Sequence, residues 1–490
     1  MKNQRLPIIL ALALVFSTTP AVCYAKATAA QRRSRNDRAH RVERTTSYPV
    51  EDVIAGEVQF DLLLAAPERR VRRSVPEHRE VRVPRGRTVP DRFRVPESRL
   101  STLLAERSII TNVLVLPSGT DPDQVCEPSV AAKGDLIVYT ANHFAAFSTD
   151  GGQRFTYLSP WRAFRGIPYN FCCDQVIQYV PQIDMFVWSL QALSYQAQVI
   201  LYATPENVRR GLWKRLLFTP RNLRAAGAQL DYTDMTFGTN MLYWSTNVFG
   251  DPEEGDISIV VRIPLAGLRR GNPLPRASKR RWGVRLAQNS GTTGYFAAHV
   301  DTSTLRVYSW DEAAEDPTFR DVTVPSWNHT TGWENVGSRV LGATKSGDEL
   351  WFAWNARARG TDRPFRFARV VRIDAHTFTL IGAPDLWSSE YRIGMPALAT
   401  NSVTSEVGIS YSFGRKLNHA VGILTGTQEH FTTAEGGTTP ADVLRWGDYL
   451  SIRPHYDNAG TPQPTFGATG YVFDGSWNIR PRYIVFGRGM

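Results

Sequence analysis

The chain has 490 residues, with 57 Lys and Arg against 46 Asp and Glu and a formal net charge of +11. Most of this charge belongs to residues 26–108, which hold 19 Lys and Arg against 12 Asp and Glu, so residues 109–490 are close to neutral. A near-neutral main domain argues against nucleic-acid binding, which needs a strongly basic face. The 37 Gly, 30 Pro and 13 Trp favour many short strands over long helices.

Residues 1–25 predict a secretory signal peptide. Lys2 and Arg5 supply the positive start, residues 6–16 supply an apolar core, and Cys23-Tyr24-Ala25 supplies small residues at a cleavage site. The apolar core is too short to span a membrane. We therefore expect an exported protein without a membrane span, either secreted to the extracellular space or periplasmic.

Residues 26–108 form an Arg- and Pro-rich segment with few aromatic residues. Arginine blocks occur at 32–35 and 69–73, and prolines recur through 75–99. Such a composition buries too little apolar surface to offset the entropy of ordering. We predict a mostly disordered basic arm or linker, with residues 50–64 as the one stretch suited to a brief strand or helical turn. The arm would be a solvated spacer or would adhere to anionic cell-surface polymers.

From residue 109 to 490 the pattern is that of an all-β domain. A first strand is expected at 110–116. Similar strands then recur every fifty to sixty residues, each with apolar residues, an aromatic, small residues and often a final amide or His. Repeats of this length predict the blades of a β-propeller, seven by this count, with six as the fallback. The recurring strands are expected at 136–142, 185–191, 241–247, 293–299, 350–355, 407–413 and 464–473.

Ring closure is also predicted from the sequence. The last unit shows three strands, at 448–453, 464–473 and 481–486, so it lacks a fourth. The strand at 110–116 can supply it from the other end of the domain. Such an exchange closes the ring and removes exposed strand edges.

The segment Ser148-Thr149-Asp150-Gly151-Gly152-Gln153-Arg154-Phe155 matches the Asp-box pattern. Asp150 can accept hydrogen bonds from turn amides, Gly152 tolerates a positive φ, and Phe155 can pack between strands. The expected role of Ser148, Asp150, Gly152 and Phe155 is therefore to lock a hairpin, away from any ligand.

Three cysteines remain after the predicted cleavage: Cys126, Cys172 and Cys173. An odd number leaves one thiol over, or places a bond within the adjacent pair. We expect Cys126 to be bonded to one of the pair, which would join the first blade to the second. The sequence shows no recognisable His partner for a cysteine nucleophile, so a disulfide is favoured over a catalytic role. His143, His299 and His455 lie in different blades without metal-ligand spacing, so we expect them to be strand-end or channel residues.

Several short motifs carry a family resemblance. They are Phe171-Cys172-Cys173-Asp174-Gln175, Cys126-Glu127-Pro128-Ser129, Asp231-Tyr232 and Trp446-Gly447-Asp448-Tyr449. Together with the Asp-box they resemble a group of uncharacterised secreted β-propeller proteins that are distantly similar to sialidases. The resemblance covers about residues 110–490 and implies a sialidase-like propeller fold without implying an activity.

Acidic residues stand at or just before the expected first strand of several blades. Because first strands line the central channel of a propeller, their starts should meet at one mouth. The candidate ligand-binding residues are Glu127, Asn142, Asp174, Asp231, Asn247, Trp446, Asp448 and Tyr449. They could form a sugar-binding funnel with Trp446 and Tyr449 as stacking surfaces, or a Ca²⁺ site from oxygen ligands. The structural alternative is that the acids cap strands and bind loop amides.

The arginine pattern departs from that of sialidases. Those enzymes use three arginines, a Tyr–Glu nucleophile pair and an Asp acid/base, with the first arginine in a Phe/Tyr-Arg-Ile-Pro motif. Here Gly166 interrupts the motif at 164–168, and the segment 261–264 lacks the aromatic residue and lies mid-chain. No spacing selects Arg372, Arg415 or Arg453. These departures argue against a classical sialidase.

We therefore expect a monomeric exported propeller that binds a glycan or a cell-surface protein at the channel mouth. The alternative is a glycoside hydrolase or lyase that acts on extracellular polysaccharide, with two carboxyl groups flanking the bond to be cleaved. A third hypothesis is a structural surface protein anchored through the basic arm. Apart from Ca²⁺ as one alternative, no cofactor is indicated.

Overall fold

The computed structural model describes residues 46–60, 106–115, 126–160, 169–330, 339–357, 363–437, 447–473 and 479–489. The predicted signal peptide and most of the predicted arm lie outside these ranges. The chain divides into two units, Met1–Arg41 and Val42–Met490, and every described residue belongs to the second. Among the described residues there are two short helices, α4 Pro205–Arg209 and α5 Leu265–Arg270.

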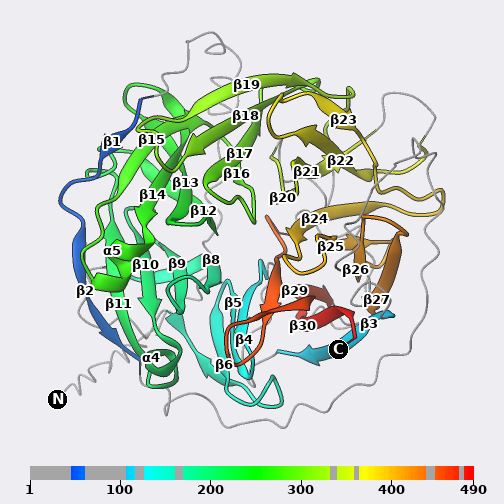
Figure 1. Ribbon diagram of the computed structural model, residues 1–490, viewed down its shortest axis with the longest axis horizontal. Helices are drawn as coiled ribbons and strands as arrows, with labels where there is room; N and C mark the ends of the chain where they lie inside the picture. Colours follow the sequence, from blue (N-terminus) through cyan, green and yellow to red (C-terminus); the bar gives the residue numbers. More distant parts are fainter. Residues whose placement is uncertain are drawn as a thin grey trace, which may run out of the picture. The chain divides into compact units, whose positions relative to one another are not determined.

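The strands of the described residues form seven antiparallel sheets around a central axis (Figure 1). This confirms the predicted seven-bladed β-propeller. Blade 1 contains β4 Ser129–Lys133, β5 Leu136–Ala141, β6 Phe144–Ser148 and β7 Thr156–Leu158. Blade 2 contains β8 Phe171–Val180, β9 Met185–Ala192, β10 Gln198–Ala203 and β11 Leu212–Phe218. Blade 3 contains β12 Gln229–Phe237, β13 Met241–Asp251, β14 Gly255–Pro264 and β15 Arg276–Arg281.

The remaining four blades have the same order from the axis outwards. They contain β16 Arg285–Leu286, β17 Thr293–His299, β18 Thr304–Asp311 and β19 Thr318–Thr323; β20 Gly342–Ser346, β21 Glu349–Ala356, β22 Phe367–Asp374 and β23 Leu380–Gly382; β24 Ile393–Thr400, β25 Val407–Phe413, β26 Asn418–Ile423 and β27 Glu429–Ala434; and β28 Ile452–Tyr456, β29 Pro462–Phe473, β30 Ile479–Arg488 and β3 Arg107–Leu114. The second strand of each blade is the strand that the recurring sequence pattern predicted.

Middle strands are apolar on both faces because neighbouring blades cover both faces. Every residue of β9, including Trp188 and Gln191, is buried. The outermost strand β19 instead exposes most of its residues and buries Val322. A strand covered on both sides is therefore a continuous apolar run, whereas an edge strand mixes polar and apolar residues.

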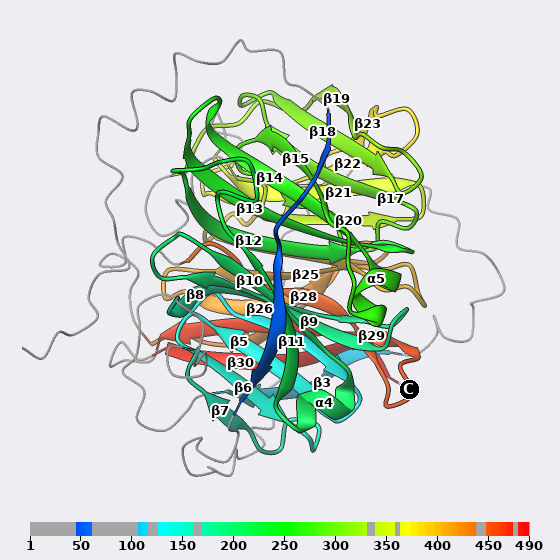
Figure 2. The ribbon, with the colours of Figure 1, turned by 90° about the vertical axis from the view of Figure 1, so that its left-hand side faces the viewer.

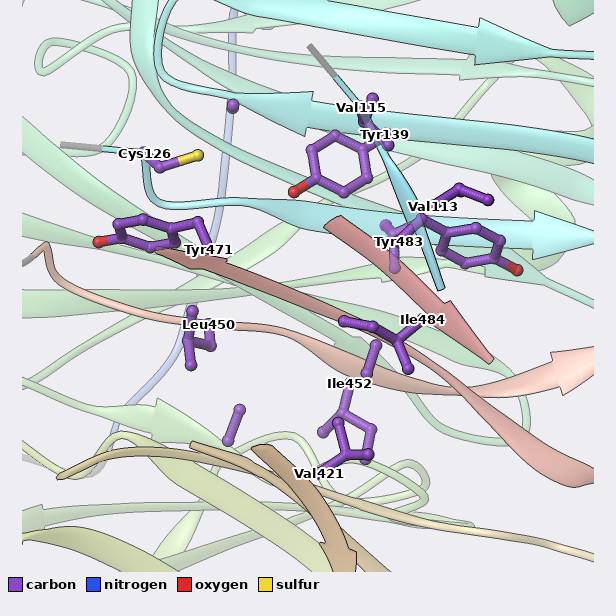
Figure 3. Packing of buried hydrophobic residues seen from close by; sticks show 14 of the residues in the cluster. Val113, Val115, Cys126, Tyr139, Val421, Leu450, Ile452, Tyr471, Tyr483 and Ile484 are labelled. Carbon is purple, nitrogen blue, oxygen red and sulfur yellow. The ribbon is translucent and has the colours of Figure 1, made fainter. Parts of the chain in front are cut away.

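The ring closes as predicted, through β3 from the N-terminal side of the domain. β3 pairs antiparallel with β30, with Asn112 opposite Ile484 and Val113 opposite Tyr483. The two strand ends differ slightly from expectation: β3 begins at Arg107, and the first strand of blade 7 begins at Ile452. Figure 3 shows the apolar cluster that this closure buries, with Val113, Tyr483 and Ile484 side by side in the outer strands.

Two strands of the basic arm extend the outer edges of blades 2 and 3. β2 Ile54–Gln59 pairs with β11, and β1 Tyr48–Pro49 pairs with β15. Figure 2 shows the two strands crossing the side of the ring. The strand suggested within 50–64 is thus present as β2, whereas β1 was not expected. The Tyr48 hydroxyl also donates to the Leu223 carbonyl at 2.8 Å. Residues 46–60, which we call the strap, therefore join blades 2 and 3.

Candidate functional site

The first strands form a closed inner ring in which β4, β8, β12, β16, β20, β24 and β28 each lie beside the next, and β28 lies beside β4. They run in one direction, as the parallel bridge between Gln288 and Thr344 illustrates. Residues at the start of these strands therefore share one mouth of the channel. Four carboxylates stand there: Glu127, Asp174, Asp231 and Asp448. We call this group the acidic mouth.

The backbone at the acidic mouth is bent in several blades. Glu127, Cys173, Tyr232 and Met395 all have positive φ, between 45° and 65°. Three of them lie in bulges of the first strand, in β8, β12 and β24. Non-glycine residues with positive φ cost about 1–3 kcal/mol each and cluster at functional sites. Bulges also redirect the side chains beside them, which here include Asp174 and Asp231.

Glu127 and Asp174 form a hydrogen-bonded carboxyl pair. Their exposed fractions are only 3% and 6%. Burial raises the pKa of Asp174 well above its ordinary value, and the charge and hydrogen bond of Glu127 raise it further, followed by Asp231 and Asp448. The raised pKa favours the protonated carboxyl of Asp174, which can share its proton with Glu127.

Asp448 is held by an arginine that no sequence motif predicted. Arg339 lies shortly before β20 in blade 5, and its Nη2 is 2.8 Å from Asp448 Oδ1. The same guanidinium stacks over Tyr232, 5.1 Å from the ring centre, and over Trp282 at 5.8 Å. Trp282 is half-buried and faces Phe249, with ring centres 6.3 Å apart. No motif around Arg339 marks it in the sequence, and its contact with Asp448 is what places it at the mouth.

Tyr449 is a structural member of the mouth. Its hydroxyl accepts a hydrogen bond from the Gln175 N–H at 2.9 Å and donates to the Gln175 carbonyl at 3.1 Å. Its ring meets Tyr232 edge to face, with centres 5.8 Å apart. At 2% exposure it offers no stacking surface to a ligand. The predicted stacking partner, Trp446, lies outside the described residues.

The two candidate amides, Asn142 just after β5 and Asn247 within β13, differ in their contacts. Asn247 Oδ1 accepts a hydrogen bond from the Ser258 hydroxyl at 2.7 Å, so its side chain is engaged within its own blade. The backbone of Asn142 joins the starts of blades 1 and 2, because its N–H donates to the Cys126 carbonyl and its carbonyl accepts from the Cys173 N–H. Within the described residues, Asn142 Oδ1 is buried without a hydrogen-bond partner.

Beneath the mouth lies a layer of charged residues in the channel. Arg285 donates from Nη1 to the Tyr232 hydroxyl oxygen at 2.6 Å, and its Nε is 3.5 Å from Asp234 Oδ2. Asp234 also accepts hydrogen bonds from the Met235 and Leu286 N–H groups. Burial raises the pKa of Tyr232 to about 12, so its hydroxyl is neutral. This layer orients Tyr232 under Arg339.

The expected disulfide of Cys126 is absent. Cys126 is a buried thiol in the apolar cluster that also contains Tyr139 and Tyr471 (Figure 3). Blades 1 and 2 are joined here by the backbone hydrogen bonds through Asn142, so they meet without the predicted bond. The side chain of Cys172 lies outside the described part of the structure.

In the described ranges no group of three or more His, Cys, Asp or Glu residues has an arrangement that would hold a metal ion. His299 is buried between Trp327 and Trp354, with ring centres 5.0 and 4.6 Å away, and burial lowers its pKa to about 3. Burial also lowers the pKa of His455 to about 4. These histidines are neutral packing residues in the positions where strands end.

Residues 148–155 form the turn between β6 and β7. The Ser148 hydroxyl donates to Asp150 Oδ1 at 2.8 Å and accepts from the Gly152 N–H at 2.9 Å. Asp150 Oδ1 also accepts from the Arg154 N–H, and Phe155 is buried in the core. Gly152 has φ of 87°. These contacts lock the hairpin, while membership in the Asp-box group stays a prediction.

Comparisons with known proteins add nothing beyond the general fold. No family model matches the chain, and no curated protein matches it. Among solved structures, an arabinanase of Penicillium chrysogenum has 10% identity and a TM-score of 0.42, covering 78% of this chain and 98% of that one. The β-propeller domain of the Trilobed protease of Pyrococcus furiosus has 8% identity and a TM-score of 0.42, covering 76% and 95%. A protein of unknown function from Dyadobacter fermentans has 10% identity and a TM-score of 0.40, covering 78% and 99%.

The resemblance to uncharacterised secreted propellers and the predicted export therefore stay predictions. No helix in the described ranges is both long and apolar enough to cross a membrane.

Proposed function

We propose that the protein is an exported carbohydrate-binding propeller whose ligand contacts the acidic mouth. The observation that supports this most directly is the convergence of four carboxylates from blades 1, 2, 3 and 7 on one end of the channel. The charges of Glu127, Asp231 and Asp448 all act on Asp174, so the four groups are close together. Structural caps would be satisfied separately within each blade.

The mixture of groups suits a sugar. The Arg339 guanidinium carries several N–H donors, while Asp231, which is half-buried, can accept a hydrogen bond. Sugar hydroxyls both donate and accept, and the C–H faces of a sugar pack on aromatic rings. Trp282 and Phe249 supply a half-buried aromatic surface beside Arg339. The described residues give less support to Ca²⁺, because no three acids are arranged as ligands and Asp448 already binds Arg339.

A glycan array with the purified mature chain tests this proposal. Wild type should bind one class of glycan, and both Asp231→Asn and Trp282→Ala should weaken that binding at least about tenfold, since each removes a contact worth about 1.5 kcal/mol or more. Asp321→Asn is the matched control, because Asp321 pairs with Arg306 on the outer strands of blade 4. Binding to cells that survives enzymatic removal of glycans would point to a protein ligand instead. A blank array together with no binding to cells would refute the proposal.

The second candidate function is glycoside hydrolysis, and the raised pKa of Asp174 is the observation that favours it. A carboxylic acid kept protonated by its surroundings can act as a general acid on a leaving group. Its hydrogen-bonded partner Glu127 is too close to flank a glycosidic bond, because the two carboxyls of glycosidases lie about 5–10 Å apart. The second carboxylate would then be Asp231 or Asp448.

A measurement of turnover distinguishes a glycoside hydrolase from a carbohydrate-binding module. A hydrolase should release reducing ends from the polysaccharide that the array identifies, and Asp174→Asn should remove turnover by a factor of about 100 or more while binding persists. A wild-type protein that binds the glycan without cleaving it would leave the binding module as the function.

A further inference from the structure

A small cavity lies at the end of the channel opposite the acidic mouth. Most of its lining residues lie late in the first strands or just after them, whereas Arg453 is the second residue of β28. The lining includes Ala132, Gln178, Phe237, Gln288, Asn289 and Arg453. Its volume is about 40 Å³. Since one water needs roughly 10–15 Å³, the cavity suits a small polyatomic ion and is too small for a sugar ring.

Arg453 brings a buried positive charge to this cavity. The residue is 5% exposed, and its Nη1 donates to the Ile452 carbonyl at 2.9 Å. Within the described residues its Nε has no hydrogen-bond partner, and no carboxylate forms an ion pair with it. A buried guanidinium without a counter-charge is costly, so proteins pair such groups with an anion.

The carboxylate across the channel is already engaged. Asp234 accepts hydrogen bonds from the Leu286 and Met235 N–H groups at 2.8 and 2.9 Å, and it faces Arg285. Burial and the neighbouring Arg285 lower the pKa of Arg453 to about 10, which leaves it protonated at neutral pH. The channel layer of Asp234, Arg285 and Arg453 therefore holds one positive charge in excess.

Carboxamide groups complete the wall. Gln288 donates from Nε2 to the Met235 carbonyl at 3.1 Å, and its Oε1 accepts from Gln178 at 3.0 Å. Asn289 donates from Nδ2 to the Lys345 carbonyl at 3.0 Å. Each carboxamide nitrogen carries two hydrogens and uses one in these bonds. The second hydrogens of Gln288 and Asn289 take part in neither of these bonds.

We infer that this cavity binds a small oxyanion, with Arg453 as the counter-charge and the carboxamides of Gln288 and Asn289 as further donors. The ligand class is inorganic phosphate, sulfate or a small free carboxylate, which share oxygen acceptors around a compact negative charge. The site is distinct from the acidic mouth, because Arg453 lies in the charged layer beneath the mouth and none of the four mouth carboxylates lines the cavity.

Titration calorimetry of the purified mature chain tests the inference. Inorganic phosphate, sulfate and acetate are titrated separately at constant ionic strength in chloride, and the strongest binder identifies the anion. Wild type should bind one of them at a single site. Arg453→Met should weaken that binding about 10- to 100-fold, the effect of losing charge-assisted hydrogen bonds worth about 1.5–3 kcal/mol.

Arg372→Met is the matched control, because Arg372 is equally buried but pairs with Glu349 at 2.5 Å in blade 5. It should leave anion binding unchanged. Ala132→Leu narrows the cavity without removing a charge and should also weaken anion binding. This variant therefore tests the inference if Arg453→Met does not fold. Wild-type protein that binds none of the three anions would overturn the inference, as would unchanged affinity in Arg453→Met and Ala132→Leu.

Discussion

The side-chain oxygen of Gln191 accepts a hydrogen bond of 2.8 Å from the backbone N–H of Tyr232. Gln191 lies in the second strand of blade 2, and Tyr232 is the positive-φ residue in the first strand of blade 3. The bulge at Tyr232 withdraws its N–H from the ladder. Gln191 supplies the missing acceptor from the neighbouring blade.

The same arrangement recurs elsewhere in the ring. Asn355 in blade 5 accepts a hydrogen bond of 2.7 Å from the N–H of Met395, the positive-φ residue in the first strand of blade 6. Between blades 3 and 4 the connection has two steps, because Asn247 binds Ser258 and the Ser258 hydroxyl accepts from the Gly283 N–H at 3.0 Å. The amides at the ends of second strands are therefore locks between blades.

Replacing Gln191 by Leu should destabilise the protein by about 1–3 kcal/mol, because the Tyr232 N–H would be left buried without an acceptor. Urea unfolding followed by tryptophan fluorescence measures the change. Gln153→Leu, at an exposed position in the turn after β6, should change stability by less than about 0.5 kcal/mol. Equal effects at the two sites would contradict the lock.

The strap formed by residues 46–60 should contribute measurable stability through Phe60. Its ring is 2% exposed and packs edge to face on Trp188, with centres 5.8 Å apart, and also contacts Trp213. Phe60→Ala should cost about 3–5 kcal/mol, as for other large-to-small core changes. Ile54 begins β2 in the same strap but is 52% exposed, so Ile54→Ala is the control. A loss below about 1 kcal/mol in Phe60→Ala would show that the strap is dispensable.

The ion pair of Arg339 and Asp448 should contribute more to the free energy of unfolding than an ion pair on the surface does. Both side chains are buried, with 11% and 7% exposed. Arg339→Met should destabilise by about 3–5 kcal/mol, because Asp448 would keep a buried charge without this partner. Arg306→Met removes a pair in which Asp321 is 41% exposed and should cost at most about 1 kcal/mol. Comparable losses in the two variants would argue against a buried ion pair at the mouth.

The features that the sequence predicted correctly depend on local pattern and symmetry. Buried middle strands such as β9 are continuous apolar runs, and such runs between turn residues can be counted along a chain. Once the runs are assigned to blades around one axis, Asp174 and Asp448 must approach each other although 274 positions separate them, the same separation as the bonded pair Gln175 and Tyr449. The convergence of acids followed from the fold alone.

The features that were missed depend on pairings between distant residues of different types. Arg339 has no sequence pattern of its own, and only its distance of 2.8 Å from Asp448 makes it part of the mouth. The edge strand β1 has two residues, and its pairing with Ala277 cannot be inferred from so short a segment. The thiol of Cys126 likewise lies in an apolar cluster, where the number of cysteines alone predicted a bond.

Asp174 should make the protein less stable as the pH rises. Its pKa in the folded state is well above the ordinary value near 4, so between these two values the folded chain holds a proton that the unfolded chain has released. Stability from this group is complete below about pH 4 and is lost as the pH rises, by about 1.4 kcal/mol per unit until the folded pKa is reached.

Asp174→Asn should therefore flatten the fall in unfolding free energy above pH 4, measured by urea titrations at a series of pH values. The amide can still donate to Glu127, so the fold should persist. Asp321→Asn, at an exposed carboxylate, should leave the profile as in wild type. A variant with an unchanged slope above pH 4 would show that Asp174 is ionised in the folded protein.

Buried histidines should make the protein less stable as the pH falls, which is the opposite of the pH dependence expected from Asp174. His419 is fully buried, with hydrogen bonds to the hydroxyls of Ser410 and Thr433. Burial, and then the charge of Arg482, lowers its pKa to about 3. The unfolded chain takes up a proton near pH 6.5, whereas the folded chain does so only near pH 3. Stability from this group is therefore complete above pH 6.5 and is lost as the pH falls towards 3.

His419→Gln should reduce the loss of stability on acidification by about 1.4 kcal/mol per pH unit between pH 6.5 and 3, although its stability at pH 8 should be lower than that of wild type because packing is lost. The measurement is the unfolding free energy in urea at pH 8, 6, 5 and 4, compared as slopes. His376→Gln is the control, because His376 is 72% exposed beside Asp348 on the surface. If His419→Gln and wild type lost stability in parallel below pH 6.5, the buried ring would have to be protonated in the folded state, and the neutral hydrogen-bonded imidazole described here would be wrong.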